Sequence, residues 1–558
     1  MKDDSSAWVG ASLAMLLVTG VPAVASGETC GGVEGAAATV ALPSVEEIER
    51  QGALVRSIQI EVQEVFDPSQ PGEGAAPYRW ANELHVRTRD DVIRAQLLFH
   101  ESEPYSQRKV AETERLLRQR RYLFDAWIEP TCYDSAAGTV DVRVRVRDVW
   151  SLNPGLRFSR KGGTNDAAFQ LEDQDFLGRG ELVAAAIGSN VDRKTILLRF
   201  QDPQLFGSWW KGSVAYADNS DGTLGELGVE RPFYSLDTRW GVGVGLVSGD
   251  RLDSRYQRGE VLDRYAEGVD RFELSGGRSE GLRNGWARRW LAGVRYERSV
   301  FDVAPDEELA AGLPADRTLA YPWLGLQWIE DDFVTARNQD QLVRTEDLQF
   351  GRALRAELGL ASPAWGADRT AGIVSLSGNV GQRLGEGRSL FVSGGLTGRL
   401  EHQGLRDAFL QGEARYYHRQ SPHTLFFASA RGAMAVEPDL DHQLLLGGDT
   451  GLRGYPLRYQ SGTASALLTA EQRYYTNWNP LHLFHIGGAV FADAGRTWGR
   501  DVTGEVPLGW LANVGVGLRI GNARSGLGNV VHLDVAVPLV RQPGMDSVQF
   551  LVETKRSF

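Results

Sequence analysis

The C-terminal part of the chain alternates apolar and polar side chains with a period of two, the pattern of β-strands with two unlike faces. Three apolar rows share this period: Ala512, Val514, Val516, Leu518 and Ile520; then Val531, Leu533, Val535, Val537 and Leu539; then Val548, Phe550, Val552 and Phe558. The positions between them are mostly small or polar, including Asn513, Gly515 and Asp534. This segment must therefore fold into a sheet whose two faces meet different surroundings.

Two architectures accommodate such strands: a soluble antiparallel sandwich and a closed transmembrane barrel. The many alternating segments without helical patterns, together with 15 Trp, 16 Tyr and 21 Phe, favour the barrel. Residues 150–558 supply roughly 400 residues, which at about 25 per strand predicts about 16 antiparallel strands. Beyond the amino terminus no run of about 18 apolar residues occurs, which argues against membrane-spanning helices. The net charge of −12 argues against nucleic acid as a partner.

The amino terminus resembles a secretory signal peptide over residues 1–25, because an apolar stretch, 11–21, precedes the small residues 23–25. Lys2 is its only basic residue, so a retained anchor stays an alternative. Residues 26–50 are rich in Gly and Ala and predict a linker, with a short helix over 45–50. Whether Cys30 and Cys132 form a disulfide or stay separate thiols is left open by the sequence.

Residues 51–149 predict a small α/β domain. A strand near 58–62 is followed by a helix that starts near Thr88 and Asp91, and by a second helix with Ser106 as its cap. Two strands then complete the unit. The long connection 65–84, rich in Pro and Gly, is either a docking loop or a flexible insertion, and we favour the insertion.

Short motifs lie at the start and end of the predicted barrel. Near its start, residues 175–180 read Asp-Phe-Leu-Gly-Arg-Gly. Near its end come the string Leu452, Arg453, Gly454 and Tyr455, the acid Glu471, the Phe-x-Asp-x-Gly string with Phe491, Asp493 and Gly495, and a terminal strand with Phe550, Val552 and Phe558. In order and spacing the chain resembles the BamA/TamA outer-membrane assembly superfamily, the bacterial surface antigen family.

The resemblance implies a 16-stranded outer-membrane β-barrel preceded by one periplasmic polypeptide-transport-associated (POTRA) domain. It also implies that Arg453 lies on an extracellular loop folded into the lumen. Strand parity then turns Glu471 and Asp493 inward, where they would clasp the guanidinium. Gly454 would supply backbone angles that other residues avoid. The alternative is that Arg453 and Asp493 only balance charge in a polar lumen.

The function implied is assembly or translocation of unfolded outer-membrane or secreted proteins, with periplasmic or lipoprotein accessory factors and no cofactor or metal. In this family a weak seam between first and last strands is thought to template incoming strands, and the terminal Phe resembles the barrel insertion signal. The alternatives are a two-partner secretion transporter, which usually has two POTRA domains and a plug helix, and a passive channel. Residues 277–281 match the Gly-x-Ser-x-Gly string of hydrolases, but we expect them in a loop and expect no enzyme activity.

Overall fold

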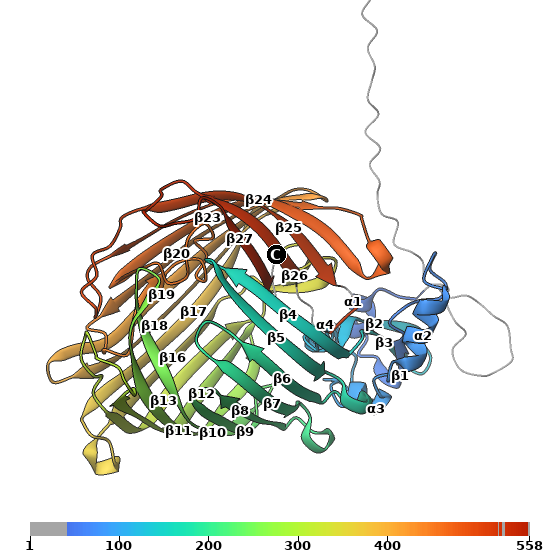
Figure 1. The fold of residues 1–558 in the computed structure, drawn as a ribbon. Helices are drawn as coiled ribbons and strands as arrows, with labels where there is room; N and C mark the ends of the chain where they lie inside the picture. Colours follow the sequence, from blue (N-terminus) through green and yellow to red (C-terminus); the bar gives the residue numbers. More distant parts are fainter. Residues whose placement is uncertain (1–41, 523, 527–529, 556–558) are drawn as a thin grey trace, which may run out of the picture.

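The computed structural model describes residues 42–522, 524–526 and 530–555, apart from the side chains of 156–158. The predicted signal peptide, Cys30 and the terminal Phe558 lie outside the described residues. Within the described part, a small N-terminal domain sits at one end of a closed barrel (Figure 1). We call this end of the barrel the near end and the opposite one the far end.

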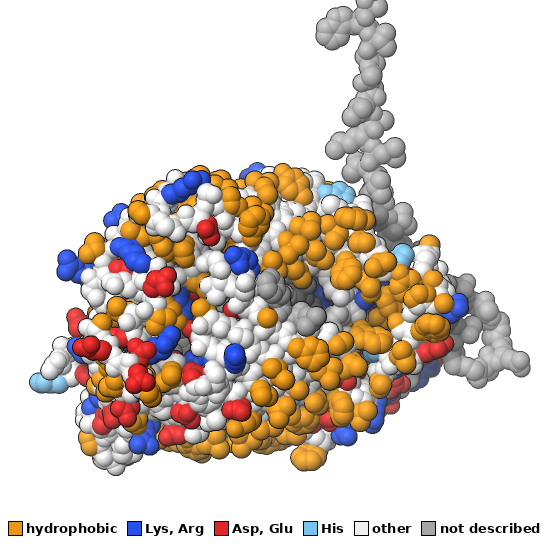
Figure 2. All heavy atoms as spheres, in the orientation of Figure 1, with side chains coloured by type: hydrophobic (Ala, Val, Ile, Leu, Met, Phe, Trp, Pro, Cys, Tyr) orange, Lys and Arg blue, Asp and Glu red, His pale blue; other side chains and the backbone are white. Residues whose placement is uncertain are grey.

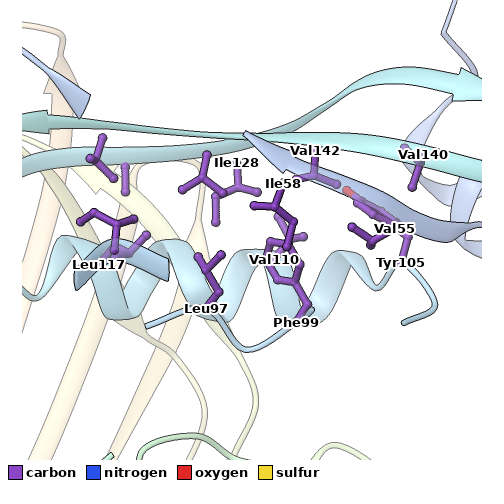
Figure 3. Packing of buried hydrophobic residues seen from close by; sticks show 14 of the residues in the cluster. Val55, Ile58, Leu97, Phe99, Tyr105, Val110, Leu117, Ile128, Val140 and Val142 are labelled. Atoms are coloured by element: carbon purple, nitrogen blue, oxygen red, sulfur yellow. The ribbon is translucent and has the colours of Figure 1, made fainter. Parts of the chain in front are cut away.

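The N-terminal domain is a three-stranded sheet packed against helices. Its elements in chain order are α1 (Val45–Arg50), β1 (Leu54–Gln63), α2 (Ala76–Leu84), α3 (Asp90–Arg94), α4 (Gln107–Arg118), β2 (Leu123–Asp134) and β3 (Thr139–Asp148). The central strand, β3, pairs parallel to β1 and antiparallel to β2. Its alternate residues Val140, Val142, Val144 and Val146 are buried in one core with Val110 and Leu117 of α4 (Figure 3). The predicted order of strand, helix, helix, strand and strand is thus present, with α2 inserted.

Three local expectations for this domain need correction. Helix α3 begins at Asp90 with Arg89 as its N-cap, because the Thr88 hydroxyl contacts two buried carboxylates instead of capping the helix. Ser106 occupies the N-cap of α4, but its side chain makes no capping hydrogen bond. The connection 65–84 contains α2 and contacts the barrel through Glu73 and Tyr78, as the docking alternative expects and not the insertion that we favoured.

The barrel wall is a single antiparallel sheet. Its first ten strands are β4 (Leu152–Lys161), β5 (Thr164–Asp173), β6 (Leu182–Ser189), β7 (Lys194–Asp202), β8 (Lys211–Asn219), β9 (Gly222–Arg231), β10 (Trp240–Gln257), β11 (Glu260–Arg283), β12 (Trp286–Val303) and β13 (Arg317–Glu330). The remaining ten are β16 (Ala353–Ala361), β17 (Ala371–Gly385), β18 (Arg388–Glu401), β19 (Gly404–Ser421), β20 (Thr424–Val436), β23 (Ala464–Tyr475), β24 (Phe484–Trp498), β25 (Leu511–Asn522), β26 (Val530–Pro538) and β27 (Gln549–Lys555).

The barrel therefore has 20 strands in the described residues, and the expectation of about 16 is wrong. The estimate assumed about 25 residues for each strand with its connection, which is more than the chain uses. Strands β4 to β9 contain only 8 to 10 residues each. Because short strands joined by short turns use fewer residues per wall crossing, the same length of chain makes more strands.

The alternation read from the sequence sets which side chains face out of the barrel. On β25, Val514 and Val516 are exposed on the outside, whereas Asn513 and Arg519 are buried inside. The same holds on β26, where Leu533 and Val535 are exposed while His532 and Asp534 are buried. Hydrophobic side chains are widespread on the outer surface of the wall (Figure 2). In the part of the chain that the structure describes, no helix is both long enough and apolar enough to cross a membrane.

Two short hairpins lie outside the wall sheet. Strands β14 (Phe333–Arg337) and β15 (Thr345–Gln349) form a hairpin between β13 and β16 at the near end (Figure 1, yellow). Strands β21 (Leu444–Leu446) and β22 (Gln460–Gly462) pair within the long far-end loop 437–463, between β20 and β23. Four 3-10 turns complete the structure: η1 (Phe176–Gly178), η2 (Leu205–Gly207), η3 (Pro363–Trp365) and η4 (Pro480–His482).

The barrel closes between its first and last strands through a short contact. Strand β27 pairs with β4 through one residue pair, Val552 with Arg160, among the described residues. The neighbouring ladders are longer, since β26 and β27 share seven pairs and β4 and β5 share ten. An ion pair between Lys161 and Glu553 supports the junction. The strand junction between β4 and β27 is called the seam below.

Candidate functional site

The far-end loop 437–463 folds back into the barrel and places Arg453 against the inner wall. The Arg453 guanidinium donates two hydrogen bonds to Asp493 on β24, from Nε and Nη2, each 2.8 Å long. Its Nη1 donates to Glu471 on β23 at 2.7 Å. The ring of Phe491 lies under the guanidinium, with its centroid 3.4 Å from Arg453 Cζ. A planar fork of donors suits this bidentate contact, whereas a lysine ammonium would offer only a point charge.

The clasp belongs to a larger network of buried charges. Three arginines and three acids are buried together: Arg453, Arg473, Arg519, Glu471, Asp493 and Asp534. Arg519 pairs with Asp534, and Arg473 Nε donates to Glu471 at 3.1 Å. The three positive and three negative charges balance, which the low dielectric of a buried site requires. Asn513 Nδ2 and Thr469 Oγ1 donate the remaining hydrogen bonds to Asp493, at 2.8 and 3.0 Å.

The small residues around the clasp make room for these large side chains. A Cβ atom on Gly515 would lie 2.4 Å from the Phe491 ring, and one on Gly517 would lie 1.8 Å from Asp534 Oδ1. A Cβ on Gly454 would lie 2.5 Å from that of Asn513. Gly454 is not among the residues with positive φ, so its role is close approach to the wall and not the unusual backbone angle expected from the sequence.

The residues on either side of Arg453 and Gly454 fix the loop to the wall. Tyr455 Oη donates to the backbone oxygens of Ala512 and Val540, both at 2.9 Å, and one hydrogen serves the two acceptors in turn. Leu452 and Tyr455 are fully buried in one cluster with Leu446, Leu467 and Leu511. Gly495 on β24 faces Leu446 of this cluster, where a Cβ would approach within 2.9 Å.

Two further anchors hold the loop, and the sequence analysis missed both. Arg458 makes a bidentate ion pair with Asp192, in the far-end turn between β6 and β7, with both contacts at 2.8 Å. At the other end of the loop, Asp439 accepts from Arg317 of β13 and Arg399 of β18. The many acidic residues in the loop suggest that it makes ion pairs. No sequence pattern, however, identifies their partners on distant strands.

The β14–β15 hairpin occupies the near end of the lumen and contacts the same charge network. Arg473 Nη1 donates to the backbone oxygen of Gln339, at 2.8 Å, and lies 3.4 Å from Asp340. Leu342 packs among buried residues of the inner wall that include Tyr417 and Tyr475. The sequence does not predict this hairpin, because its strands are only five residues long and resemble an ordinary turn between wall strands.

The same hairpin is tied to the N-terminal domain. Arg118 of α4 makes a bidentate ion pair with Asp347 of β15, with contacts of 2.9 and 2.7 Å. Thr345 Oγ1 donates to Asp125 of β2 at 2.6 Å. The Arg115 guanidinium lies 3.8 Å from the centroid of the Phe333 ring. A continuous set of contacts thus links the domain, the hairpin, the charge network and the far-end loop.

The motif at residues 175–180 forms the near-end turn onto which the domain docks. Thr88 Oγ1 lies 2.7 Å from Asp175 Oδ2 and 2.9 Å from Asp148 Oδ1. One hydroxyl hydrogen can serve only one of two carboxylates, so a proton on Asp175 would complete the pair of hydrogen bonds. Burial raises the pKa of Asp175 to about 6, and the nearby Asp148 adds to that rise. Gly178 is required for docking, because a Cβ there would lie 2.3 Å from the Arg87 carbonyl oxygen.

Two polar cavities remain on the side of the lumen away from the clasp. One of about 620 Å³ lies between residues 119–122 of the domain and strands β6 to β11, and its lining includes Arg121, Lys211 and Glu273. Another of about 490 Å³ is bounded by β13 and β16 to β20 and includes Glu413 and Arg431. The lumen is therefore filled on one side and hollow on the other.

The other residues singled out in the sequence fall in separate places. On the terminal strand, Phe550 points outward, Val552 forms the seam pair, and Phe558 lies outside the described residues. Cys132 is buried on β2 and is disulfide-bonded, and its pairing with Cys30, which the sequence leaves open, involves a residue outside the described ones. The Gly-x-Ser-x-Gly match lies on strand β11 and not in a loop, because its glycines and polar side chains suit the wall. Its Ser279 hydroxyl donates to the Arg288 carbonyl oxygen at 2.8 Å.

No protein-family model and no curated protein matches the chain. Solved structures similar to it at low identity include the following three. BamA from Haemophilus ducreyi, lacking POTRA domains 1–3, is 12% identical with a TM-score of 0.40, over 90% of this chain and 85% of that one. CdiB from Acinetobacter baumannii is 11% identical with a TM-score of 0.43, over 91% and 74%. CdiB from Escherichia coli is 13% identical with a TM-score of 0.48, over 91% and 77%.

Proposed function

We propose that the chain is an outer-membrane assembly or translocation factor, with the near end of its barrel and a single POTRA domain in the periplasm. It would receive unfolded outer-membrane or secreted proteins there and insert or transport them at the barrel. The work would be done by backbone pairing and displacement of packed segments, without cofactor or covalent chemistry. The apolar outer surface of the 20-stranded barrel supports the membrane location.

The observation that carries the proposal is the seam. A wall in which one junction has a single residue pair among its described residues would open there first, since each ladder hydrogen bond adds to the cost of separation. The edges exposed by opening β4 and β27 would present unpaired backbone groups to a client strand. The buried clasp would keep Arg453 and its part of the far-end loop on the β23–β24 side while the seam opens, because its contacts do not involve β4 or β27.

Transport through the lumen, as in a two-partner secretion transporter, is the second candidate. Its support is the pair of polar cavities that extends from the N-terminal domain along the hollow side of the lumen. A chain passing this way would have to displace the β14–β15 hairpin. A hairpin that can be displaced in this way fits a gated channel better than an open pore.

Two engineered disulfides separate these routes in proteoliposomes. Arg160→Cys with Val552→Cys would lock the seam, since these residues are direct partners across it. Leu342→Cys with Gly521→Cys would lock the hairpin, because a Cβ on Gly521 would lie 2.8 Å from that of Leu342. The wild-type protein with and without reductant controls for the disulfide at Cys132.

For the assembly proposal, the oxidised seam lock should abolish the accelerated insertion of an unfolded barrel protein, and reductant should restore it. If insertion continues at the wild-type rate with the seam locked, the assembly mechanism is wrong. Loss of polypeptide or ion passage only with the hairpin lock would favour transport through the lumen.

A further inference from the structure

Helix α2 has its polar face turned toward the protein and its apolar face turned away. Asn82 bonds the backbone of Phe66 twice, accepting from its N–H at 3.1 Å and donating to its oxygen at 2.8 Å. The ring of Tyr78 packs 4.8 Å from that of Phe66. These contacts come from one side of the helix, because residues four apart in sequence share a face.

The opposite face of α2 presents large apolar side chains that the described residues leave mostly exposed. Trp80 is 66% exposed and Leu84 is 76% exposed, and no residue of the helix is buried. Val86, just after the helix, is also exposed. The four-residue spacing puts Trp80 and Leu84 on one side. A helix in water would place such residues inward, so this face is built for an apolar contact.

The position of α2 shows which contact is available. Tyr78 Oη donates to the backbone oxygen of Leu481, at 2.9 Å, in the near-end turn between β23 and β24. The helix therefore lies beside the barrel rim. In the same turn Trp478 and Leu481 are exposed. Hydrophobic side chains run from the barrel wall toward the N-terminal domain in Figure 2.

Other near-end turns also present exposed apolar side chains at the barrel rim. Leu177, Phe206 and Leu481 each have a positive φ of 56 to 58° inside a 3-10 turn, and each side chain is exposed. Phe206 is 99% exposed. A positive φ is unfavourable for residues of this size, and in all three turns it presents an apolar side chain at the rim. The apolar outer belt of the barrel thus continues around the rim to α2.

We propose that α2 is an interfacial helix that rests on the periplasmic leaflet of the lipid bilayer around the barrel. Trp80 and Leu84 enter the boundary between headgroups and acyl chains, and the rim side chains Leu177, Phe206 and Leu481 share that depth. Tryptophan suits this boundary because its ring is apolar and its N–H is polar. The helix would hold the N-terminal domain at a fixed tilt under the barrel. This inference rests on the membrane location proposed above.

Site-directed spin labels test the inference in the full-length chain, reconstituted in vesicles of phosphatidylethanolamine and phosphatidylglycerol. Labels are placed at Leu84→Cys, at Phe169→Cys on the outer wall of β5, and at Ser135→Cys. Ser135 lies in the exposed turn that starts β3, at the end of the strand away from the barrel, so it is the aqueous control. Collisions with oxygen and with a water-soluble nickel chelate report lipid and water exposure at each label.

The inference predicts that the label at 84 resembles the one at 169, with high oxygen and severalfold lower nickel accessibility than at 135. Nickel accessibility at 84 equal to that at 135, with 169 in lipid, would overturn the inference and leave the membrane location intact. Water exposure at both 84 and 169 would overturn the membrane location and this inference together. In vesicles, dipolar broadening between labels at 84 on two molecules, unchanged by a higher lipid-to-protein ratio, would reveal a second copy as the partner and would also overturn the inference.

Discussion

Two neighbouring parts of the barrel wall are held together in opposite ways. Strands β23 to β26 share complete ladders and enclose a balanced network of six buried charges. The seam, one strand further on, has a single residue pair among the described residues and a half-buried ion pair between Lys161 and Glu553. A rigid part of the wall, filled with buried charges, thus lies beside the junction that has the fewest strand pairs among the described residues. The far-end loop spans both sides of the seam, since Arg453 fixes it to β23 and β24 while Arg458 anchors it to the β6–β7 turn, so the partly exposed pair of Arg458 with Asp192 has to break if the seam opens widely.

Removal of the clasp arginine should have the largest effect on this contrast. Arg453→Ala leaves Asp493 and Glu471 buried without their main partner, which should lower the free energy of unfolding by about 3 to 5 kcal/mol. The shift from folded to unfolded mobility on unboiled gels, taken over a temperature series, measures it.

The matched control for this variant is Arg458→Ala. Arg458 anchors the same loop to Asp192, but the pair is partly exposed, so its loss should cost at most about 1 kcal/mol. Equal effects of the two substitutions would show that the buried network has no special role in fixing the loop.

The docking of the N-terminal domain should depend on pH through Asp175. Its pKa is raised from 3.8 to about 6 by burial, so the docked state binds a proton more tightly than the undocked state. This contribution, at most about 3 kcal/mol, is complete below about pH 4 and is lost as the pH rises through 6. Hydrogen exchange of the backbone N–H of Arg89, which donates to Gly178, should therefore quicken between pH 5 and 7 after correction for the intrinsic rate.

Asp175→Asn is the control for that titration, because the amide stays neutral and can still donate to Thr88. The variant should show protection that no longer changes over this range. An unchanged pH dependence in the variant would show that a group other than Asp175 titrates, and that the docking turn does not cause the pH dependence.

A smaller effect is expected from filling the space beside the charge network. Gly517→Ala places a methyl group against Asp534 and should cost about 1 to 3 kcal/mol, since the surrounding arginines and acids cannot shift freely. Gly488→Ala on the adjacent strand is the control, because its nearest atom would be 3.4 Å away. Thermal unfolding of the two variants compares them, and equal stability would show that the network is loosely packed.

The smallest effect is expected at the seam itself. Lys161→Met removes its ion pair with Glu553, which is partly exposed, and should change the free energy of unfolding by at most about 1 kcal/mol. The same substitution should speed client insertion, because it weakens the junction that must open. A loss of several kcal/mol would mean that the seam is held as firmly as the rest of the wall.

The sequence predicted the features that depend on strand parity. Alternation put Asn513 and Asp534 on the face opposite the apolar rows, and parity turned Glu471 and Asp493 inward, because a wall strand has only two faces. Features that depend on distant contacts were missed. The β14–β15 hairpin, the Arg458 anchor and the inverted face of α2 are fixed by partners more than 100 residues away, and no local pattern specifies such partners. The strand number was also missed, because turn lengths decide it.

Hydrogen exchange of the reconstituted protein, measured strand by strand, shows directly whether the seam opens more easily than the clasped wall. Backbone amides of β27 and of its partner segment in β4 should exchange much faster than those of β24 and β25, although all four strands belong to one barrel. Equal protection of the two pairs of strands would mean that the seam is no easier to open than the clasped wall.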